Sequence, residues 1–392
     1  MFRMEYSARP FRRQAPHDGL PFEYLAQRSG LRRRSTEADV IGRRLTNMAK
    51  YAIRRPLERL GYALYRMSDE ERLAIQQSSR QSFEAIFGAD LSRLRELTAR
   101  YAQVTLPIAN HSAWSVKHRS ETRLGIGWGG IDLRAFRGHS AYVWSYGCYW
   151  SHGRLDAMAT KLKYFTYAAY VKNKDSMQLL QTLHEDGAFG CITFSYPGVG
   201  KVSRDLLESV VQINFLHKYI NVLARDGLRI LDIGAGYGRM AHRMLEANPR
   251  LKSYTCVDAV PESTFICEFY LKYRGLANRV QVVAMDELEQ RLSSYHLALN
   301  IHSFSECTYA AIEWWLRKLK QLQVRYLMIV PNNPTRFLST EVDGSRRDFA
   351  PLLEGLGYKL VAREPVFDDQ EVREYMKVSD NMFLFDCPDS AP

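Results

Sequence analysis

The chain has 392 residues, of which 46% are hydrophobic and 25% charged, and its formal net charge is +11 at pH 7. This length suits two or three domains, and this composition is ordinary for a globular protein. No run approaches the ~20 apolar residues of a membrane-spanning helix, and the N-terminus lacks the apolar core of a secretory signal. The six cysteines include no C-x-x-C pair, which argues against a zinc site or a disulfide framework and favours a reducing cytoplasm.

The positive charge is concentrated near the N-terminus. Residues 1–60 hold 14 Lys and Arg against 6 Asp and Glu, so they carry +8 of the net +11. Such an arm can attract anionic lipid headgroups, a lipid-linked diphosphate substrate or nucleic acid, or it can remain a solvated basic segment. RNA recognition needs aromatic rings interleaved with cations, which are sparse here, whereas attraction to a membrane needs no fixed geometry. We therefore favour peripheral contact with an anionic membrane over nucleic acid.

Two regions precede the regular part of the chain. Residues 1–105 form a basic N-terminal region that is polar and poorly periodic at first and helical from about residue 46. Residues 106–202 form a mixed region in which we predict helices over 156–172 and 177–184 and a short strand between turns at 187–190 and 196–200. This region is rich in aromatic side chains, and the run at 142–150 suits either a lid over an acceptor or, as we favour, the core.

Residues 203–392 alternate regularly between helices and strands. Such an alternation predicts an α/β fold with a doubly wound, mostly parallel seven-stranded sheet, as in Rossmann-like proteins. The predicted helices span 205–224, 240–247, 263–274, 310–322 and 348–356, and the predicted strands span 229–233, 253–258, 280–284, 296–301, 326–330, 358–364 and 382–385.

A glycine-rich loop, Asp232-Ile-Gly-Ala-Gly-Tyr-Gly238, ends the first of these strands. Glycines at Gly234, Gly236 and Gly238 let the backbone turn sharply and approach a ligand that a Cβ would obstruct. A dinucleotide site would prefer G-x-G-x-x-G, with the pyrophosphate at a helix N-terminus. The spacing found here suits a cofactor without a phosphate, such as S-adenosylmethionine, and disfavours NAD.

Acidic residues follow the next two strands. Asp258 lies 20 residues after Gly238, where a carboxylate can accept hydrogen bonds from both ribose hydroxyls, although it could instead only cap the following helix. Asp286 follows the third strand and can reach the adenine amine. The predicted cofactor site therefore comprises Asp232, Gly234, Ala235, Gly236, Gly238, Asp258, Ala259, Asp286 and Asn300.

The fourth strand opens into Asn300-Ile-His-Ser-Phe-Ser-Glu306, beside the expected position of a transferable methyl group. Methylases of exocyclic amines commonly carry Asn/Asp-Pro-Pro-aromatic here, so this sequence argues against an adenine or glutamine methylase. A hydroxyl acceptor must lose a proton, which a neutral histidine can accept near pH 7. We predict His302 as the general base, with Glu306 as its orienting partner or substitute. Alternatively, His302 bonds only backbone and Glu306 caps the next helix.

The loop after the fifth strand, Pro331-Asn-Asn-Pro334, should line the same rim. Asn332 and Asn333 can hydrogen-bond a polyhydroxylated acceptor, although Asn-Pro is also an ordinary turn. No Asp-Asp pair occurs near the fourth strand, so we predict that activity needs no metal.

From residue 196 to residue 385 the chain resembles a bacterial family of sugar O-methyltransferases. The resemblance rests on the glycine loop, Asp258-Ala-Val-Pro-Glu-Ser-Thr-Phe, Asn300-Ile-His-Ser-Phe-Ser-Glu and Ile329-Val-Pro-Asn, which occur in this order. It implies a class I methyltransferase fold, S-adenosylmethionine as cofactor, and a hydroxyl of a saccharide or lipid-linked saccharide as acceptor. The alternatives are methylation of another hydroxyl or of RNA, and a non-catalytic scaffold that only binds the cofactor.

Overall fold

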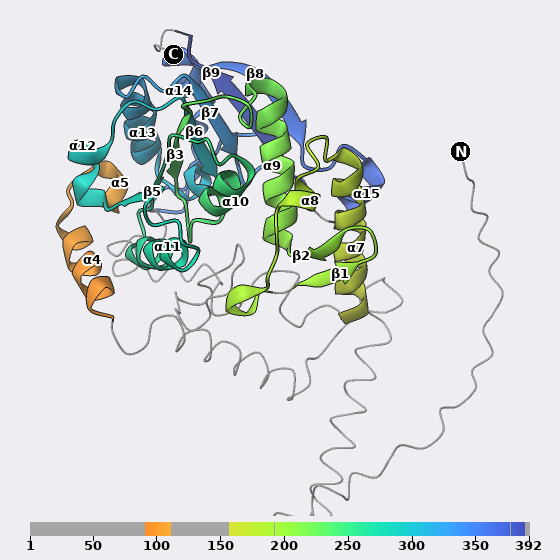
Figure 1. The fold of residues 1–392 in the computed structure, drawn as a ribbon. Coiled ribbons are helices and arrows are strands. Elements are labelled where there is room, and N and C mark those ends of the chain that lie inside the picture. The colour runs from red at the N-terminus through yellow and green to blue at the C-terminus, as the bar shows by residue number, and fades with distance from the viewer. Residues whose placement is uncertain (1–90, 111–156, 192, 377, 389–392) are drawn as a thin grey trace, which may run out of the picture. The chain divides into compact units, whose positions relative to one another are not determined.

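The computed structural model describes residues 91–110, 157–191, 193–376 and 378–388, all of which belong to one compact unit, 64–392 (Figure 1). The basic arm, most of the helical stretch predicted from residue 46, and the aromatic run at 142–150 lie outside the described residues.

A seven-stranded sheet forms the centre of the unit (Figure 1), in the order β5-β4-β3-β6-β7-β9-β8. The strands β3 to β7 pair in parallel, whereas β9 runs antiparallel to both β7 and β8. The predicted doubly wound, mostly parallel fold is confirmed, and each of the seven predicted strands is present to within one residue at either end. Their bounds are β3 Arg229–Ile233, β4 Ser253–Val257, β5 Val280–Val283, β6 Leu297–Ile301, β7 Tyr326–Val330, β8 Lys359–Pro365 and β9 Asn381–Asp386.

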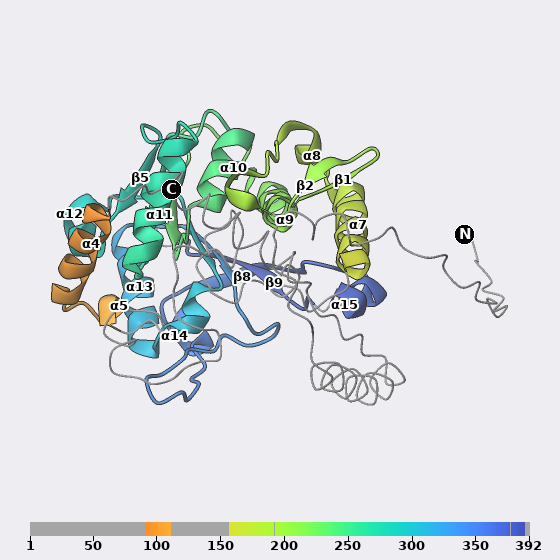
Figure 2. The same ribbon diagram turned by 90° about the horizontal axis from the view of Figure 1, so that it is seen from below.

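Helices cover both faces of the sheet. Figure 2 shows α9 and α10 on one side of the sheet and α13 and α14 on the other. Because both faces are covered, the central strands are continuous apolar runs, such as Tyr-Leu-Met-Ile-Val in β7. The helices and 3-10 turns between and after the strands are α9 Arg204–Ile220, α10 Arg239–Ala247, α11 Pro261–Tyr273, η3 Met285–Glu287, α12 Leu288–Arg291, η4 Ser303–Glu306, α13 Tyr309–Gln321, α14 Ala350–Gly355 and α15 Gln370–Met376.

The described elements that precede the sheet in the chain are α4 Ser92–Gln103, α5 Pro107–Asn110, α7 Ala157–Lys174, α8 Leu179–Thr182, η2 Ala188–Gly190 and the hairpin of β1 Phe194–Tyr196 and β2 Gly200–Val202. The helix predicted over 177–184 is only the single turn α8. Gln178 takes the left-handed conformation (φ 54°) just before it, and helical backbone cannot continue through such a residue. The predicted short strand is one arm of the hairpin.

The helix α4 packs against α11, one of the helices that cover the sheet. Leu97 and Tyr101 of α4 are almost completely buried and belong to the same apolar core as the strands. This end of the N-terminal region therefore shares the core of the sheet and its helices.

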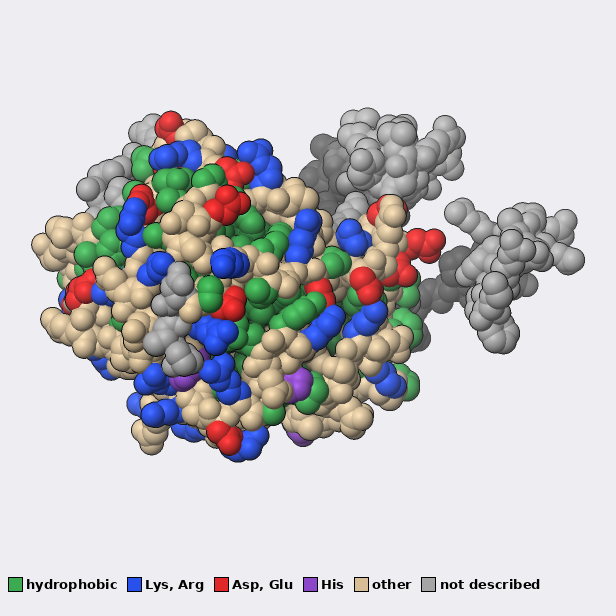
Figure 3. All heavy atoms as spheres, turned by 90° about the horizontal axis from the view of Figure 1, so that it is seen from above, with side chains coloured by type: hydrophobic (Ala, Val, Ile, Leu, Met, Phe, Trp, Pro, Cys, Tyr) green, Lys and Arg blue, Asp and Glu red, His purple; other side chains and the backbone are tan. Residues whose placement is uncertain are grey.

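The surface mixes charged and apolar side chains. On the face drawn in Figure 3, Lys and Arg lie among Asp and Glu, with apolar side chains between them. Exposed apolar residues of the unit include Leu360 and Val361 of the edge strand β8. Within the described ranges, every helix is too short or too polar to cross a bilayer.

Candidate functional site

The glycine loop lies where the strand order reverses, because β3 has β4 on one side and β6 on the other. Ligands of open α/β sheets bind beyond the carboxyl ends of the strands at such a point. Gly234, Gly236 and Gly238 all have positive φ angles, of 78°, 59° and 86°. A Cβ added at Gly234 would lie 2.2 Å from the Cβ of Ser303, in the turn after β6. Glycine is therefore required here both by conformation and by close approach.

The carboxylate of Asp258, just after β4, is held in place by two backbone donors. The N–H of Gly236 donates to Oδ2 at 2.9 Å, and the N–H of Val260 donates to Oδ1 at 2.8 Å. The Ser263 side chain also hydrogen-bonds the carboxylate. The Val260 N–H, two residues after Asp258 and just before α11, closes an Asx-turn with the Asp258 side chain. Asp258 thus serves the local structure and is at the same time positioned beside the glycine loop.

The environment of Asp258 leads to a prediction about pH. Burial raises the pKa of Asp258 to about 7, although the two backbone donors oppose the shift. Only the ionised carboxylate can accept from two ribose hydroxyls through both oxygens, so cofactor affinity should be highest above pH 7. Below pH 7 it should fall toward a limit of about tenfold per pH unit. Calorimetric titration of S-adenosylmethionine between pH 6 and pH 8.5 measures this. The Asp258→Asn variant should lack this pH dependence, and an equal dependence in both proteins would contradict the assignment.

Asp286 is engaged by a residue that the sequence analysis did not single out. Arg100 of α4 donates from Nε to Oδ2 at 2.8 Å and from Nη2 to Oδ1 at 2.9 Å, and it also pairs with Glu287. The neighbouring Tyr101 hydroxyl lies 2.8 Å from the Thr264 hydroxyl of α11. The helix α4 therefore forms a wall of the predicted cofactor site on the side of Asp286.

Asp232 and Asn300 bind protein groups in this structure. The buried Asp232 carboxylate accepts from the Tyr254 hydroxyl at 2.8 Å, and burial raises its pKa to about 6. The Asn300 amide donates to the Ile233 carbonyl at 3.0 Å and accepts from the Phe304 N–H at 2.8 Å. Asn300 thus fastens the turn after β6 to the end of β3, which is what brings Ser303 against Gly234. Both residues therefore hold the strand ends and the turn of the site in place.

His302 has an unusual backbone and surroundings. Its φ is 67°, a left-handed conformation that is uncommon for a residue with a side chain. Its ring Nε2 lies 3.8 Å from Oδ2 of Asp380, and its side chain is 36% exposed. Its Nδ1 is buried and has no hydrogen-bond partner among the described residues. A strained residue with an unsatisfied polar atom is a candidate for function rather than for stability.

Asp380 belongs to a charged cluster that sequence reasoning missed. It immediately precedes β9, and because β9 is antiparallel to β7, this end of β9 lies at the same edge of the sheet as His302. Burial raises the pKa of Asp380, and the charge of Glu208 adds to that rise, whereas His302 opposes it. Glu208, near the start of α9, pairs with Arg204 at 2.5 Å. Burial alone would raise the pKa of Glu208, but the charges of Arg204 and Arg239 outweigh burial, and the pKa is lowered.

The remaining predicted residues lie around this edge in different roles. Oδ1 of Asn333 accepts from the N–H groups of Thr335 and Arg336, at 3.0 and 2.9 Å, and so stabilises its own turn. The Asn332 side chain is exposed, while its N–H donates to the Ser305 hydroxyl at 3.0 Å. Glu306 ends η4 and is partly buried. Within the described ranges, no group of three or more His, Cys, Asp or Glu side chains could hold a metal ion.

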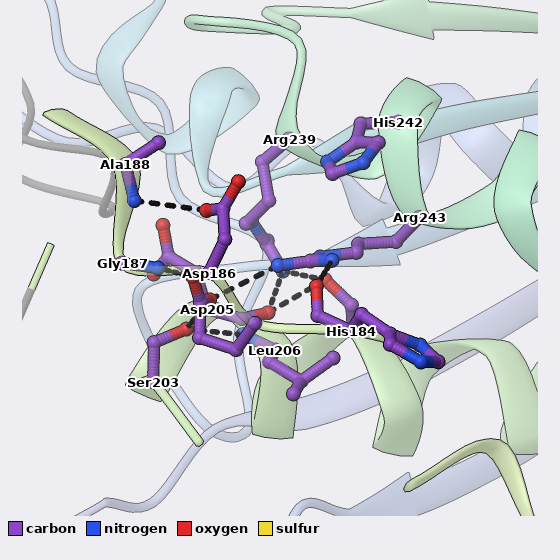
Figure 4. Close-up of polar contacts among 12 residues, drawn as sticks. His184, Asp186, Gly187, Ala188, Ser203, Asp205, Leu206, Arg239, His242 and Arg243 are labelled. Atoms are coloured by element: carbon purple, nitrogen blue, oxygen red, sulfur yellow. Dashed lines mark hydrogen bonds and ion pairs between the residues drawn. The ribbon is translucent and has the colours of Figure 1, made fainter. Parts of the chain in front are cut away.

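A buried polar network links the glycine loop and the helix after it to neighbouring parts of the chain (Figure 4). Arg243 of α10 donates to Glu185 at 3.0 Å and to the His184 carbonyl at 2.6 Å. The Tyr237 hydroxyl of the loop donates to Asp205 of α9 at 2.6 Å. Because these contacts join the loop, α9 and α10, they hold the glycine backbone in one conformation.

This network predicts a large loss of stability on its disruption. The side chains of Arg243 and Glu185 are each 4% exposed. The Arg243→Ala variant should lose about 3–5 kcal/mol of unfolding free energy, because it leaves the charge of Glu185 buried without its cationic partner. The matched control is Arg250→Ala, whose partner Asp226 and whose own side chain are largely exposed, and which should change little. Urea denaturation of both variants measures the difference, and equal losses would contradict the account.

No family model and no curated protein matches the chain, so its resemblance to sugar O-methyltransferases stays a prediction. Solved structures that it resembles include TrmK of M. capricolum in complex with S-adenosyl-homocysteine, at 12% identity over 45% of this chain and 68% of that one, with a TM-score of 0.32. TrmN from Thermus thermophilus has 16% identity over 47% of this chain and 48% of its own, with a TM-score of 0.33. The [4+2]-cyclase SpnF has 14% identity over 58% of this chain and 94% of its own, with a TM-score of 0.34. The order of the strands, their crossovers and the glycine loop at the switch point establish the Rossmann-like fold of class I methyltransferases.

Proposed function

We propose that the chain is an S-adenosylmethionine-dependent methyltransferase. The observation that carries the proposal is the cradle of the glycine loop, in which Gly234 leaves no room for a Cβ and Gly236 holds the Asp258 carboxylate in place. The loop would hold the amino-acid part of the cofactor, Asp258 the ribose, and the segment at Asp286 the adenine. The backbone beside Ala235 and Ala259 would complete the contacts. Because fold alone does not determine activity, this site and not the sheet supports the proposal.

When bound, the cofactor supplies a methyl group on a positively charged sulfonium centre. His302 would take the proton from the acceptor hydroxyl, whose oxygen keeps the electron pair of the O–H bond and is thereby a better nucleophile. A neutral imidazole has one N–H and one accepting nitrogen. The Asp380 carboxylate lies 3.8 Å from Nε2, beyond hydrogen-bond distance, and would stabilise the protonated imidazole by its charge. Asp380 thus takes the partner role that the sequence analysis gave to Glu306.

We infer that the acceptor is a sugar hydroxyl of a saccharide or a lipid-linked saccharide. The Asn-Ile-His-Ser sequence after β6 supports a hydroxyl acceptor, and the exposed side chain of Asn332 at the rim supports a polyhydroxylated one. The proposal includes a cytoplasmic location and attraction of residues 1–60 to an anionic membrane.

Incubation of the full-length protein with methyl-labelled cofactor and a cell extract tests the function. The label should appear in saccharide or lipid-linked saccharide and should be released by glycosidases but not by ribonuclease. Label in RNA would overturn the acceptor class. Binding of the cofactor without any transfer would favour the non-catalytic scaffold.

A further inference from the structure

A cavity of about 440 Å³ lies at the rim of the sheet. It is bounded by the end of β8, the start of β9 and the turn that follows β7. The side chains that line it include Arg363, Arg373, Ser379 and Asn381. Asn381 donates from Nδ2 to the Pro334 carbonyl at 2.7 Å, which ties the start of β9 to the turn. The cavity is therefore built from parts of the fold that hold one another in place.

Among the residues that the structure describes, the two arginines of this cavity have no acidic partner. Arg363 donates to the Pro334 carbonyl at 3.4 Å, and its guanidinium lies 5.3 Å from the centre of the Phe383 ring. Arg373 donates from Nε to the Phe367 carbonyl at 3.2 Å. Across the described ranges, neither guanidinium lies within ion-pair distance of a carboxylate, in contrast to Arg100, Arg204 and Arg243. Each guanidinium has five N–H donors, so most of these remain available to a ligand.

The cavity adjoins the segment that carries Asp380. Ser379 and Asn381 line the cavity, and Asp380 between them lies 3.8 Å from the His302 ring. The turn from Pro331 to Pro334 borders the cavity and carries Asn332 at the same rim.

We propose that this cavity binds an oxyanion, phosphate or carboxylate, that is carried by the acceptor. The inference rests on the proposed function, and it narrows the acceptor to an anionic saccharide. A guanidinium presents parallel N–H groups that match the two oxygens of a carboxylate or a phosphate, and such charge-assisted hydrogen bonds are stronger than neutral ones. A neutral hexose would leave both cations without a counter-charge. Arg363 and Arg373 are thus specificity-determining residues that anchor the acceptor while His302 acts on its hydroxyl.

The test is calorimetric titration of the full-length protein with inorganic phosphate, glucuronate and glucose at constant ionic strength. We expect saturable binding of phosphate or of glucuronate at one site and no binding of glucose. The anion that binds more tightly indicates whether the acceptor carries a phosphate or a carboxylate. The Arg363→Gln/Arg373→Gln double variant should weaken that binding at least tenfold.

The matched control is Arg317→Gln, which removes the charge of an exposed arginine on α13, outside the cavity. Anion binding should be unchanged in this control. Equal weakening in the control and the double variant, no weakening in the double variant, or no saturable binding of either anion would each overturn the proposal. Affinity for S-adenosylmethionine is measured on the same proteins and should not change. If the proposed function is wrong, the parent protein will fail to bind S-adenosylmethionine. The anion titration does not depend on that result.

Discussion

Replacing His302 by Asn is expected to lower the rate of methyl transfer by about a hundredfold to ten-thousandfold, the usual contribution of a general base. Asparagine tolerates the left-handed backbone that His302 adopts, so the variant should fold and keep the turn after β6. Affinity for the cofactor should be unchanged, because the glycine loop and Asp258 are untouched. Single-turnover rates with labelled cofactor, together with calorimetric affinities, measure the two effects separately.

The pH dependence of the rate distinguishes a base from a structural residue. If His302 accepts the proton, the pH profile of the rate should differ between the parent enzyme and His302→Asn. The Asp380→Asn variant should keep the form of the parent's profile but turn over more slowly, because the protonated ring loses the carboxylate charge 3.8 Å from Nε2. A variant His302→Asn with the parent's rate and pH profile would remove His302 from the mechanism.

Replacing Gly234 by Ala should abolish productive binding of the cofactor. The new Cβ would lie 2.2 Å from the Cβ of Ser303, and the residue would also have to hold a φ of 78°. The conformational cost is about 1–2 kcal/mol, and the overlap adds about 1–3 kcal/mol. We expect a lower unfolding free energy and at least a tenfold loss of affinity, since the loop must shift to relieve the overlap.

Two further variants separate these costs. Gly344→Ala places a methyl group at a φ of 83° with nothing within 4 Å, so it carries the conformational cost alone. The double variant Gly234→Ala/Ser303→Gly removes the overlapping side chain and should recover most of the difference between the two single variants. Thermal unfolding and cofactor titration of all three provide the comparison. A double variant no better than Gly234→Ala would show that the close approach is not the cause.

The central strands could be predicted from the sequence because they are short, mostly apolar runs that are followed by turn-forming residues, whereas the edge strand β8 carries Lys359, Arg363 and Glu364. Strands β3 and β7 occupy the predicted residues, 229–233 and 326–330. The helix at 177–184 could not be predicted correctly, since periodicity does not show that Gln178 turns left-handed. There, Asp175 instead accepts a hydrogen bond from the Leu180 N–H at 2.7 Å.

The sequence could group the candidate residues that follow consecutive strands, but not those that reach the same part of the sheet in another way. Asp380 lies 78 positions after His302 and reaches it only because β9 runs antiparallel, and the sequence pattern of a strand carries no direction. Arg100 belongs to a helix whose sequence contains no motif, yet it binds Asp286. Arg204 and Glu208, four residues apart at the start of α9, were the one local signal that could have indicated a charged cluster.

The central claim is that this loop binds S-adenosylmethionine, and calorimetric titration of the full-length protein with S-adenosylmethionine and with NAD tests it most directly. The account predicts saturable binding of S-adenosylmethionine at one site, no binding of NAD, and an affinity lower by about 1–3 kcal/mol in Asp258→Ala, which loses the partner of the ribose hydroxyls. Binding of NAD without binding of S-adenosylmethionine would contradict it.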